Sequence, residues 1–580
     1  MIKTFIKCIR EYKLPTILTL SVIVFEVFIE VLIPFFTAEL VNDIKASAPM
    51  REVLRMGLIL VGMAMLSLLC GASGGFFGSK ASAGFARNVR RDVFERIQSF
   101  SFENIDRFST ASLVTRLTTD ITNVQMAFMM SIRAAVRAPL MFLFSIVMAY
   151  RMGGTLALCF VVVIPVLVAG LLLIARKAMP AFRRVFRKYD RMNESIEENV
   201  RAMRVVKGFA REEYEKQKFA NASHDISIDF TKAERIVAMN NPLMTLCMNF
   251  NLVFVLWVGS RLIITSHGQF IDVGQISAML VYGMQILMSL MMFSMIYVML
   301  TVSYESMQRI VEVLREEPSL KSPLLPVTDV TDGSIDFEHV SFKYAQTAQN
   351  YALADVDLHI KSGMTVGILG GTGSSKSTLV QLIPRLYDVT EGRVLVGGVD
   401  VRAYDLVTLR NAVSMVLQKN LLFSGTIADN LRWGNEDATD EELVEACKLA
   451  QADEFIRAFP DGYQSRIEQG GANVSGGQKQ RLCIARALLK KPKILILDDS
   501  TSAVDMKTDA LIRAGFKSYI PETTKIIIAQ RVASVQDADL ILVMDNGGIA
   551  ASGTHEELLA SSEIYREVYE QQTRGGAENE

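Results

Sequence analysis

The chain lacks the cysteine pairing and the excess of charge that mark several classes of protein. Its six cysteines are scattered without a C-x-x-C pair, so reduced thiols are expected rather than a disulfide framework or a zinc site. The net charge of −1 gives no global basicity that would favour nucleic acid. The opening residues, MIKTFIKCIREYK, contain no short apolar segment with a small-residue cleavage site, so no removable signal peptide is expected.

Apolar residues are abundant instead, and the long apolar runs fall before about residue 300. Half of the 580 residues are hydrophobic, yet 21% are charged. Six runs are long enough to cross a hydrocarbon core about 30 Å thick. They lie at residues 14–41, 53–77, 133–150, 155–175, 242–265 and 276–302. The sequence therefore predicts a polytopic α-helical membrane domain with six transmembrane helices over residues 1–315.

Two long charged segments, 79–130 and 176–240, separate these runs and carry many lysines and arginines. Both have helical character, so they are expected to extend the spans well into the cytosol. Basic loops stay on the cytoplasmic side, which places both termini there. Residues 1–14 mix basic and apolar side chains. They are expected to form a helix in the membrane interface, with a cytosolic leader as the alternative.

Charged residues inside the predicted spans are candidates for function. Glu26 and Glu30 lie one helical turn apart, and carboxylates within a membrane are costly unless they face a partner or a water-filled cavity. They are interpreted as a site that attracts a cationic substrate, with pairing to a structural arginine or lysine as the alternative. Arg133 and Arg137 lie near a predicted membrane edge and are expected to extend toward water.

The last span is rich in methionine, and Met288, Met292 and Met295 are candidate substrate contacts. Flexible thioethers suit a surface that fits varied apolar ligands, although ordinary packing explains them too. Together with Glu26 and Glu30, these methionines weakly favour lipophilic cations or mixed apolar compounds as ligands, while lipids and peptides stay open. The spans begin almost at once, so no N-terminal peptidase domain is expected.

A second region follows a proline-containing linker at residues 316–333. From residue 334, short β-rich runs alternate with helical runs, which is typical of an α/β sheet. This soluble domain is expected to extend over residues 334–575, followed by a short tail at 576–580.

The soluble domain contains a glycine-rich stretch, 370–378, between a strand-like run at 364–369 and a helix-like run at 379–386. That order predicts a phosphate-binding loop whose backbone N–H groups surround nucleotide phosphates. Lys376 would reach the β- and γ-phosphates, and Ser377 would bind Mg²⁺. Ser375 stands where the motif has glycine. The predicted nucleotide-binding residues are Gly371, Thr372, Gly373, Ser374, Ser375, Lys376, Ser377 and Thr378.

A second nucleotide motif occurs at residues 494–499, where four apolar residues precede two aspartates. Residues 494–497 predict a buried strand, and Asp498 at its carboxyl end would hold Mg²⁺ through water. With the glycine-rich loop about 120 residues earlier, this motif indicates a P-loop NTPase that binds ATP and Mg²⁺.

Between the two motifs, residues 474–481 read VSGGQKQR and closely resemble the signature motif of ATP-binding cassette (ABC) proteins. Other positions match landmarks of this family. Tyr344 matches the aromatic residue that stacks on adenine, Gln418 matches the glutamine that contacts Mg²⁺, and residues 502–505 match the D-loop. With six spans before the cassette, almost the whole chain resembles one half of an ABC exporter.

The resemblance implies that two such halves pair and hold two ATP molecules between them. Each ATP would lie between the phosphate loop of one chain and the signature motif of the other. Ser475, Gly476, Gly477 and Gln478 would thus contact a nucleotide bound mainly by the partner. The resemblance also places coupling helices near residues 103–110 and 201–209.

Three positions depart from the family pattern, and all lie on the phosphate-loop side. Asp499 replaces the usual catalytic glutamate, Gln530 replaces a histidine, and Ser375 replaces a loop glycine. The signature motif keeps the pattern except for Val474, although residues 468–473 before it also depart. The set resembles the degenerate-site subunit of a heterodimeric bacterial multidrug ABC exporter, which predicts weak hydrolysis in this chain's own site. A homodimeric exporter and an ATP-gated channel or regulatory subunit are the alternatives, and inward transport stays open.

Overall fold

The computed structural model describes residues 2–266, 269–345, 348–500 and 504–577, and the chain divides into two compact units. The first comprises Met1–Gln98 and Thr110–Glu316, and the second comprises Ser99–Ser109 and Glu317–Glu580.

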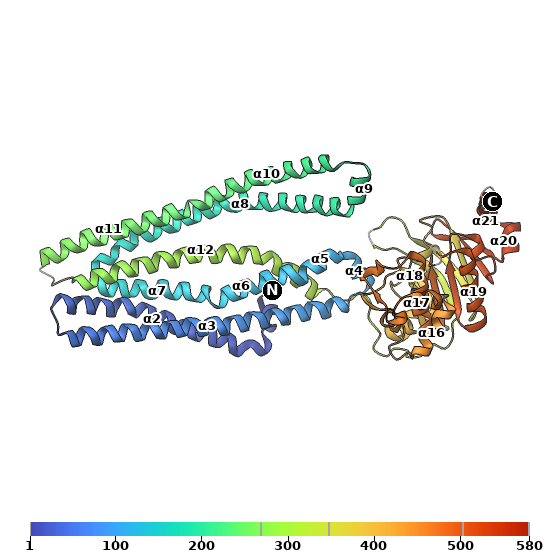
Figure 1. The fold of residues 1–580 in the computed structure, drawn as a ribbon, viewed down its shortest axis with the longest axis horizontal. Helices are drawn as coiled ribbons and strands as arrows, with labels where there is room; N and C mark the ends of the chain where they lie inside the picture. The colour runs from blue at the N-terminus through green and yellow to red at the C-terminus, as the bar shows by residue number, and fades with distance from the viewer. Residues whose placement is uncertain (1, 267–268, 346–347, 501–503, 578–580) are drawn as a thin grey trace. The chain divides into compact units, whose positions relative to one another are not determined.

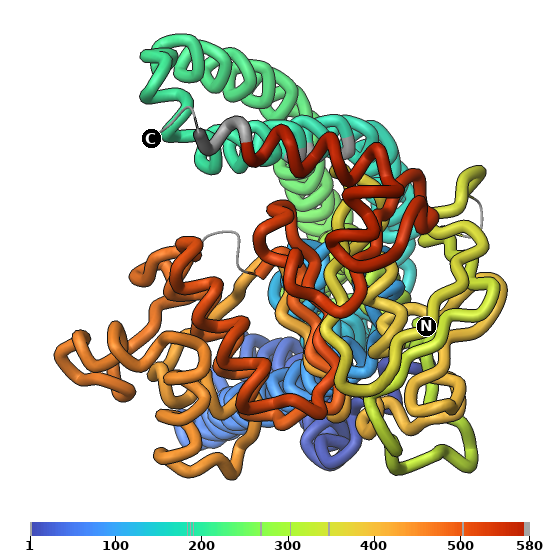
Figure 2. Tube along the Cα trace, turned by 90° about the vertical axis from the view of Figure 1, so that its right-hand side faces the viewer, coloured from blue at the N-terminus to red at the C-terminus, as the bar shows by residue number. Residues whose placement is uncertain are grey.

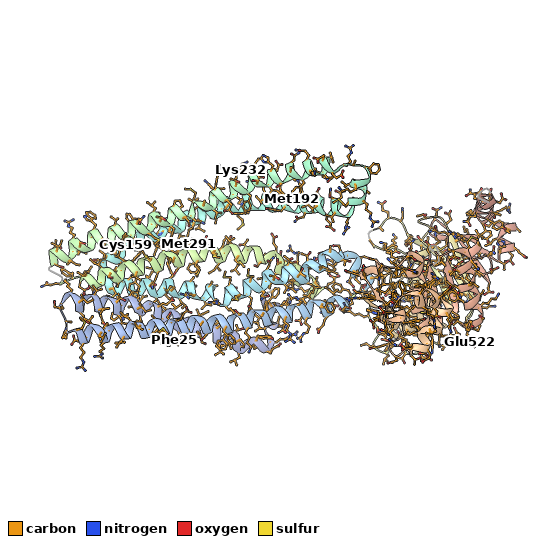
Figure 3. All side chains as sticks on the ribbon, in the orientation of Figure 1. Phe25, Cys159, Met192, Lys232, Met291 and Glu522 are labelled. Atoms are coloured by element: carbon orange, nitrogen blue, oxygen red, sulfur yellow. The ribbon has the colours of Figure 1, made fainter. Side chains whose placement is uncertain are left out.

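Long helices build the first unit (Figure 1). The predicted apolar runs lie in or very largely in the helices α2 (Lys13–Lys45), α3 (Met50–Gln98), α7 (Ala134–Gly153), α8 (Cys159–Arg201), α11 (Asn240–Ser266) and α12 (Val273–Arg315). By length and apolar composition, five helical stretches in the described residues qualify as membrane spans, and one of them, Thr110–Arg201, contains both α7 and α8. Large apolar side chains such as Phe25 of α2 are half exposed, as expected for residues on a helix face that contacts lipid (Figure 3). The predicted helical membrane domain is confirmed.

The two charged segments are also helical. The first extends α3 and continues through α4 (Phe102–Arg107), α5 (Thr110–Thr115), the π-helical turn η2 (Arg116–Asp120) and α6 (Ile121–Ile132). The second forms the outer half of α8 and returns through α9 (Met203–Gly208) and α10 (Glu212–Ala238). Figures 1 and 2 both show α8 and α10 as a long hairpin, with α9 at its turn.

The N-terminal residues form α1 (Ile2–Lys7) and the short 3-10 helix η1 (Arg10–Tyr12). The ring of Phe5 is buried against Phe85 of α3, with the ring centroids 6.1 Å apart. Asn88 of α3 donates a hydrogen bond to the carbonyl of Cys8 at 3.0 Å. The apolar side of this segment therefore packs on α3.

The second unit contains the predicted α/β sheet. Five strands are parallel to their neighbours in the order β11-β3-β10-β9-β6, and β12 is added antiparallel beside β11. Their bounds are β3 (Thr365–Gly370), β6 (Val413–Val416), β9 (Ile494–Asp498), β10 (Thr524–Ile528), β11 (Leu540–Asp545) and β12 (Gly548–Gly553). Residues 494–497 of β9 are almost completely buried, as their apolar sequence predicts.

An antiparallel sheet and a helical region complete this unit. The sheet has the order β2-β1-β4-β5, from β1 (Ile335–Phe342), β2 (Leu353–Ile360), β4 (Glu391–Val396) and β5 (Val399–Asp400). A short pair joins β7 (Gly425–Thr426) to β8 (Arg466–Ile467). The helices are α13 (Lys376–Leu382), α14 (Leu406–Ala412), α15 (Ile427–Arg432), α16 (Asp440–Leu449), α17 (Asp453–Ala458), α18 (Gly476–Leu489), α19 (Met506–Tyr519), α20 (His555–Ser561) and α21 (Glu563–Ala577).

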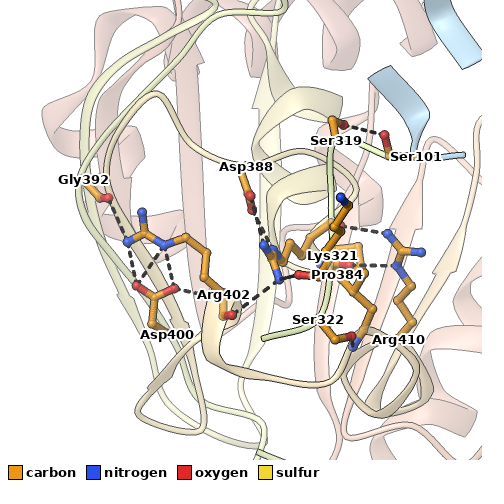
Figure 4. Close-up of polar contacts among 12 residues, drawn as sticks. Ser101, Ser319, Lys321, Ser322, Pro384, Asp388, Gly392, Asp400, Arg402 and Arg410 are labelled. Carbon is orange, nitrogen blue, oxygen red and sulfur yellow. Dashed lines mark hydrogen bonds and ion pairs between the residues drawn. The ribbon is translucent and has the colours of Figure 1, made fainter. Parts of the chain in front are cut away.

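The short segment 99–109 packs with the second unit although it lies between helices of the first in the sequence. The hydroxyl groups of Ser101 and Ser319 are 2.5 Å apart (Figure 4), and Asn104 of α4 donates to the carbonyl of Glu317 at 3.1 Å. The hydroxyl of Tyr387 donates to Asp106 at 2.5 Å. These bonds fix α4 on the surface of the α/β unit.

Candidate functional site

The glycine-rich loop connects the buried strand β3 to α13. A Cβ at Gly370 would lie 2.3 Å from the carbonyl oxygen of Met544 on the neighbouring strand, so this close approach requires glycine. Ser375, directly before α13, has φ 70° and ψ 23°, which is the left-handed conformation. A serine there costs about 1–2 kcal/mol relative to glycine. The backbone at residue 375 thus adopts the left-handed conformation that suits glycine, although serine disfavours it.

Lys376 turns its ammonium group into the loop. Its Nζ donates to the carbonyl oxygens of Gly370 and Gly371, at 2.8 and 2.7 Å. Burial lowers the pKa of Lys376, and the nearby carboxylates of Asp498 and Asp499 oppose that shift. A charge held among backbone groups of this loop is placed to meet an anionic phosphate.

Ser377 and Asp498 meet beside the loop because β3, β10 and β9 are adjacent parallel strands. The hydroxyl of Ser377 donates to Asp498 Oδ1 at 3.0 Å. Burial raises the pKa of Asp498, and the charge of Asp499 adds to the effect. Gln418 is exposed two residues beyond the end of β6, the strand next to β9. Hydroxyl, carboxylate and amide oxygens are a donor set that fits a hard divalent cation such as Mg²⁺.

Asp499 and Gln530 are also brought together. Asp499 follows β9, Gln530 follows β10 after one residue, and Gln530 Nε2 donates to Asp499 Oδ2 at 2.7 Å. A neutral amide therefore binds one oxygen of the carboxylate that was expected to replace a catalytic glutamate. Glutamine can donate a hydrogen bond, but it can neither carry charge nor transfer a proton as histidine does.

Gln572 of α21 holds the backbone around Gln530, and sequence reasoning did not identify it. Its Nε2 donates to the carbonyl of Gln530 at 2.9 Å, and its Oε1 accepts from the N–H of Val532 at 2.8 Å. One amide side chain thereby fixes the segment on both sides of Arg531. No motif could have indicated this role, because the contact joins residues about 40 positions apart.

Tyr344 lies beside the helix that follows the loop. Its hydroxyl is 2.9 Å from Thr378 Oγ1, and its ring is half exposed. The ring meets that of Tyr387 edge to face, with the centroids 5.3 Å apart. The hydroxyl of Tyr387 also donates a hydrogen bond to Asp106 of α4. The ring of Tyr387 therefore lies between α4 and Tyr344, the candidate adenine-binding residue. Tyr387 is a second residue that the sequence did not single out.

The signature residues form the N-terminus of α18. Ser475 caps this helix: its Oγ accepts from the N–H of Gln478 at 3.3 Å, and Gln478 Oε1 accepts from the N–H of Ser475 at 2.9 Å. Ser475 and Gly476 are exposed, while Gly477 is partly exposed. In the described part of the chain, no hydrogen bond or ion pair joins these residues to the phosphate loop. The expected D-loop falls partly outside the described residues, at Ser502 and Ala503, while Asp505 caps α19.

Comparisons with known proteins agree with this geometry. The family described as "ABC transporter transmembrane region" matches residues 16–308, and the family described as "ABC transporter" matches residues 353–502. The chain belongs to the ABC transporter family. The nucleotide-binding unit is an ABC-type ATPase coupled to transport, and the chain is a multi-pass membrane subunit of an ABC transporter.

Curated relatives match this ABC transporter subunit along most of its length. An uncharacterized ABC transporter ATP-binding protein, YfiB of Bacillus subtilis, is 37% identical over 98% of this chain and 99% of its own length. A protein of Mycobacterium bovis named as a fatty acid ABC transporter ATP-binding/permease protein is 34% identical over 84% of this chain and 75% of its own. A solved bacterial Atm1-family ABC exporter with ATP bound shares the fold, with a TM-score of 0.82 and 23% identity, covering 97% of this chain and 98% of that one.

The charged candidates in the membrane helices of the transporter form one ionic cluster. Arg137 of α7 bonds Glu26 through Nη1 and Glu30 through Nη2, each at 2.7 Å. The expectation that Arg137 extends toward water was therefore wrong, because two carboxylates on the facing helix α2 offer it stronger partners. Glu26 is buried, and a Cβ at Gly71 of α3 would lie only 3.3 Å from its Oε1. Glu26 and Glu30 therefore pair with a structural arginine, which was the alternative interpretation of these two carboxylates. A role for them in the transport pathway stays a prediction.

The methionine candidates share one face of α12, at intervals of four and three residues. Met288 and Met295 are about 60% exposed and Met292 is less so, whereas Met279 nearer the helix start is fully buried. The three candidates are thus available at the surface of this subunit. Contact with a substrate stays a prediction.

Proposed function

We propose that this chain is one subunit of a heterodimeric ABC exporter and that it binds Mg-ATP in its own site but hydrolyses it poorly. A second ABC half-transporter chain would supply a competent catalytic site. The pair would lie in a bacterial inner membrane with the termini on the cytoplasmic side. Lipophilic drugs or other amphiphiles would be exported, and a relative named as a fatty acid transporter supports an amphiphilic substrate.

The contact between Gln530 and Asp499 carries this proposal. A base that activates water must accept a proton through a correctly placed oxygen. Asp499 is shorter than glutamate by one C–C bond, about 1.5 Å, and displacement on that scale costs about 10²-fold in rate. Since the amide of Gln530 also occupies one of its oxygens, the carboxylate is poorly placed and partly engaged.

In this proposal the site retains what binding requires. Tyr344 would stack on adenine, while the residues 371–378 surround the phosphates with Lys376 among them. Ser377, Asp498 and Gln418 would hold Mg²⁺, partly through water, and the ion would neutralise charge on the phosphates. ATP bound here would keep the two cassettes together.

The signature turn would serve the other ATP site. Backbone N–H groups at the start of a 14-residue helix favour a phosphate, and Ser475 and Gly476 expose that turn. Ser475, Gly476, Gly477 and Gln478 would therefore complete a site whose water-activating glutamate and histidine belong to the partner. Hydrolysis in that site would reset the cycle.

The steady-state ATPase rate of this chain purified alone in lipid tests the proposal. Near-zero turnover with nucleotide still bound is expected, and the Asp499→Glu/Gln530→His variant should raise the rate by restoring the family's residues. Robust turnover of the wild-type chain alone, without a second cassette chain in the preparation, would contradict the proposal and favour a homodimer.

A further inference from the structure

Three side chains that commonly bind metals meet on the exposed face of the antiparallel sheet in the second unit. They are His339 of β1 and Asp355 and Asp357 of β2. The imidazole Nδ1 of His339 lies 3.0 Å from Asp355 Oδ1 and 3.1 Å from Asp357 Oδ2. Imidazole nitrogen and carboxylate oxygen together form a donor set that divalent transition-metal ions accept. The nucleotide chemistry proposed above uses none of the three residues.

Two bulges in the pairing of β1 with β2 bring these side chains together. Between residues 337 and 340, β1 advances three positions while β2 advances two, and His339 lies in this bulge. At the following pair the extra residue is in β2, where Asp355 lies. Both residues have φ 47°, and histidine and aspartate are among the residues that adopt positive φ most readily after glycine. The bulges therefore turn side chains of two neighbouring strands toward one point.

The two aspartates of this cluster have no basic partner among the residues that the structure describes. Neither carboxylate forms an ion pair with a lysine or an arginine there, and each lies against His339 only. Glu338, the next residue along β1, is bonded to Arg393. The hydrogen bond to Asp355, and then the charge of Asp357, raise the pKa of His339. This point of the sheet thus stabilises an added positive charge.

The spacing of the ligand atoms fits direct coordination of a metal ion. Zinc binds imidazole nitrogen and carboxylate oxygen at about 2.0–2.2 Å, so adjacent ligand atoms lie about 3.0–3.5 Å apart. Nδ1 carries at most one hydrogen and cannot donate fully to both carboxylates, whereas an ion can bind all three atoms at once. The backbone N–H of His339 donates to Asp357 Oδ1 at 2.9 Å, which orients that carboxylate with its other oxygen toward Nδ1.

We propose that His339, Asp355 and Asp357 bind a divalent transition-metal ion such as Zn²⁺, with water completing the coordination. The ion links β1 to β2 on the exposed face of the sheet. Mg²⁺ prefers oxygen ligands alone and binds weakly here, so the site is separate from the proposed Mg-ATP site. Because Tyr344 follows β1 by two residues, the ion also braces the strand that leads to this tyrosine.

Equilibrium dialysis against Zn²⁺ tests the site. The full-length chain, in nanodiscs and without a histidine tag or nucleotide, should bind about one Zn²⁺ in the presence of excess Mg²⁺. His339→Gln and, separately, Asp355→Asn should each weaken binding at least about tenfold, because each removes a ligand. All three side chains are exposed, so both variants are expected to fold.

The same sheet offers a matched control. His359 of β2 is also exposed and lies against a single carboxylate, that of Asp336 on β1. His359→Gln should therefore bind Zn²⁺ like wild type. Equal binding by His339→Gln and wild type, or displacement of the zinc by Mg²⁺, would indicate an adventitious ion only and would overturn the proposal.

X-ray absorption at the zinc edge identifies the ligands of the bound ion. The competing donors are the thiols of the six cysteines, all of which are buried. Nitrogen and oxygen neighbours that include one imidazole, at about 2.0–2.2 Å, are expected from the proposed site. A sulfur neighbour at about 2.3 Å would assign the zinc to cysteine and contradict the proposal.

Amide hydrogen exchange tests whether the ion links the two strands. Zn²⁺ should slow exchange over β1 and β2 in wild type and in His359→Gln, but not in His339→Gln. The strand β9 belongs to the other sheet and is the internal reference, since its exchange should not change. Unchanged exchange in β1 and β2 with zinc bound would contradict placement of the ion between them. None of these measurements uses ATP, so they stand apart from the heterodimer proposal.

Discussion

The two nucleotide-facing regions of the cassette differ in how closely they keep the family's pattern. On the phosphate-loop side, Ser375 occupies a left-handed conformation and Gln530 binds the carboxylate of Asp499. On the signature side, Ser475 and Gln478 form a complete helix cap, and the two glycines that follow leave the turn open. In the proposed function, the changes on the phosphate-loop side would affect activation of water and would leave the phosphate and metal ligands in place. Binding and hydrolysis would then be separable within one cassette.

The largest expected effect comes from the signature side. Ser475→Glu would place a carboxylate at a turn proposed to face the partner's γ-phosphate, and repulsion should lower the ATPase rate of the pair about 10²-fold. Asp499→Ala, on the phosphate-loop side, should change the rate less than about threefold, since this site contributes little turnover in the proposal. Steady-state ATPase assays of the two variants with the wild-type partner make the comparison. A loss with Asp499→Ala as large as that with Ser475→Glu would contradict the division of roles.

Gln572 provides the next test, because it acts on the phosphate-loop side without touching nucleotide. Gln572→Ala removes both bonds that hold the backbone around Gln530. Loss of two hydrogen bonds of about 1 kcal/mol each, about 2 kcal/mol together, should shorten ATP retention in this site by up to about 30-fold. Single-turnover release of radiolabelled ATP measures retention, and Gln571→Ala, an exposed neighbour, is the control. A variant with a lowered melting temperature but unchanged retention would indicate a merely structural role for Gln572.

The sequence predicted the local arrangement of the cassette well, because each motif combines a buried strand with the turn at its end. Residues 494–497 are apolar, so they form a central strand, and Asp498 at its carboxyl end meets Ser377 from the loop of a nearby parallel strand. Ser375 stands where the motif has glycine, and its φ of 70° is the left-handed conformation that glycine adopts readily. These features follow from short-range rules of strand, turn and helix.

Contacts between distant segments could not be predicted in the same way. Tyr387 joins α4 to the ring of Tyr344, and Gln572 binds the backbone beside Gln530, yet neither belongs to a motif. In the membrane unit, hydropathy located the spans but did not show which helices face each other. Arg137 was therefore expected to extend toward water, although α2 presents two carboxylates to it.

Ser375→Gly tests whether the phosphate-loop side stores strain. Glycine relieves the left-handed conformation of residue 375 but loses more entropy on folding, so a net gain of about 0.5–1 kcal/mol is expected. The melting temperature of the nucleotide-free chain should rise. Ser374→Gly is the matched control: Ser374 is buried, does not have positive φ and donates to the carbonyl of Gly371 at 2.9 Å, so it should lower the melting temperature. Equal shifts in the two variants would show that residue 375 is not strained.

The smallest expected effect is a pH-dependent one at Asp498. Burial first, and then the charge of Asp499, raise the pKa of Asp498 in the folded, nucleotide-free chain. Its protonated form is therefore favoured by folding. The stability that this protonated group contributes is present below the ordinary pKa of aspartate and is lost as the pH rises through the raised pKa.

Asp498→Asn tests this effect, because asparagine cannot ionise and still offers an oxygen to Ser377. It should raise the melting temperature at pH 7.5, by less than Ser375→Gly does, and the difference from wild type should shrink as the pH falls toward 4. Addition of Mg-ATP should reverse the order at pH 7.5, since only the carboxylate offers the metal a negative charge. A difference in melting temperature that does not change with pH would mean that the charge of Asp498 is already compensated in the empty site.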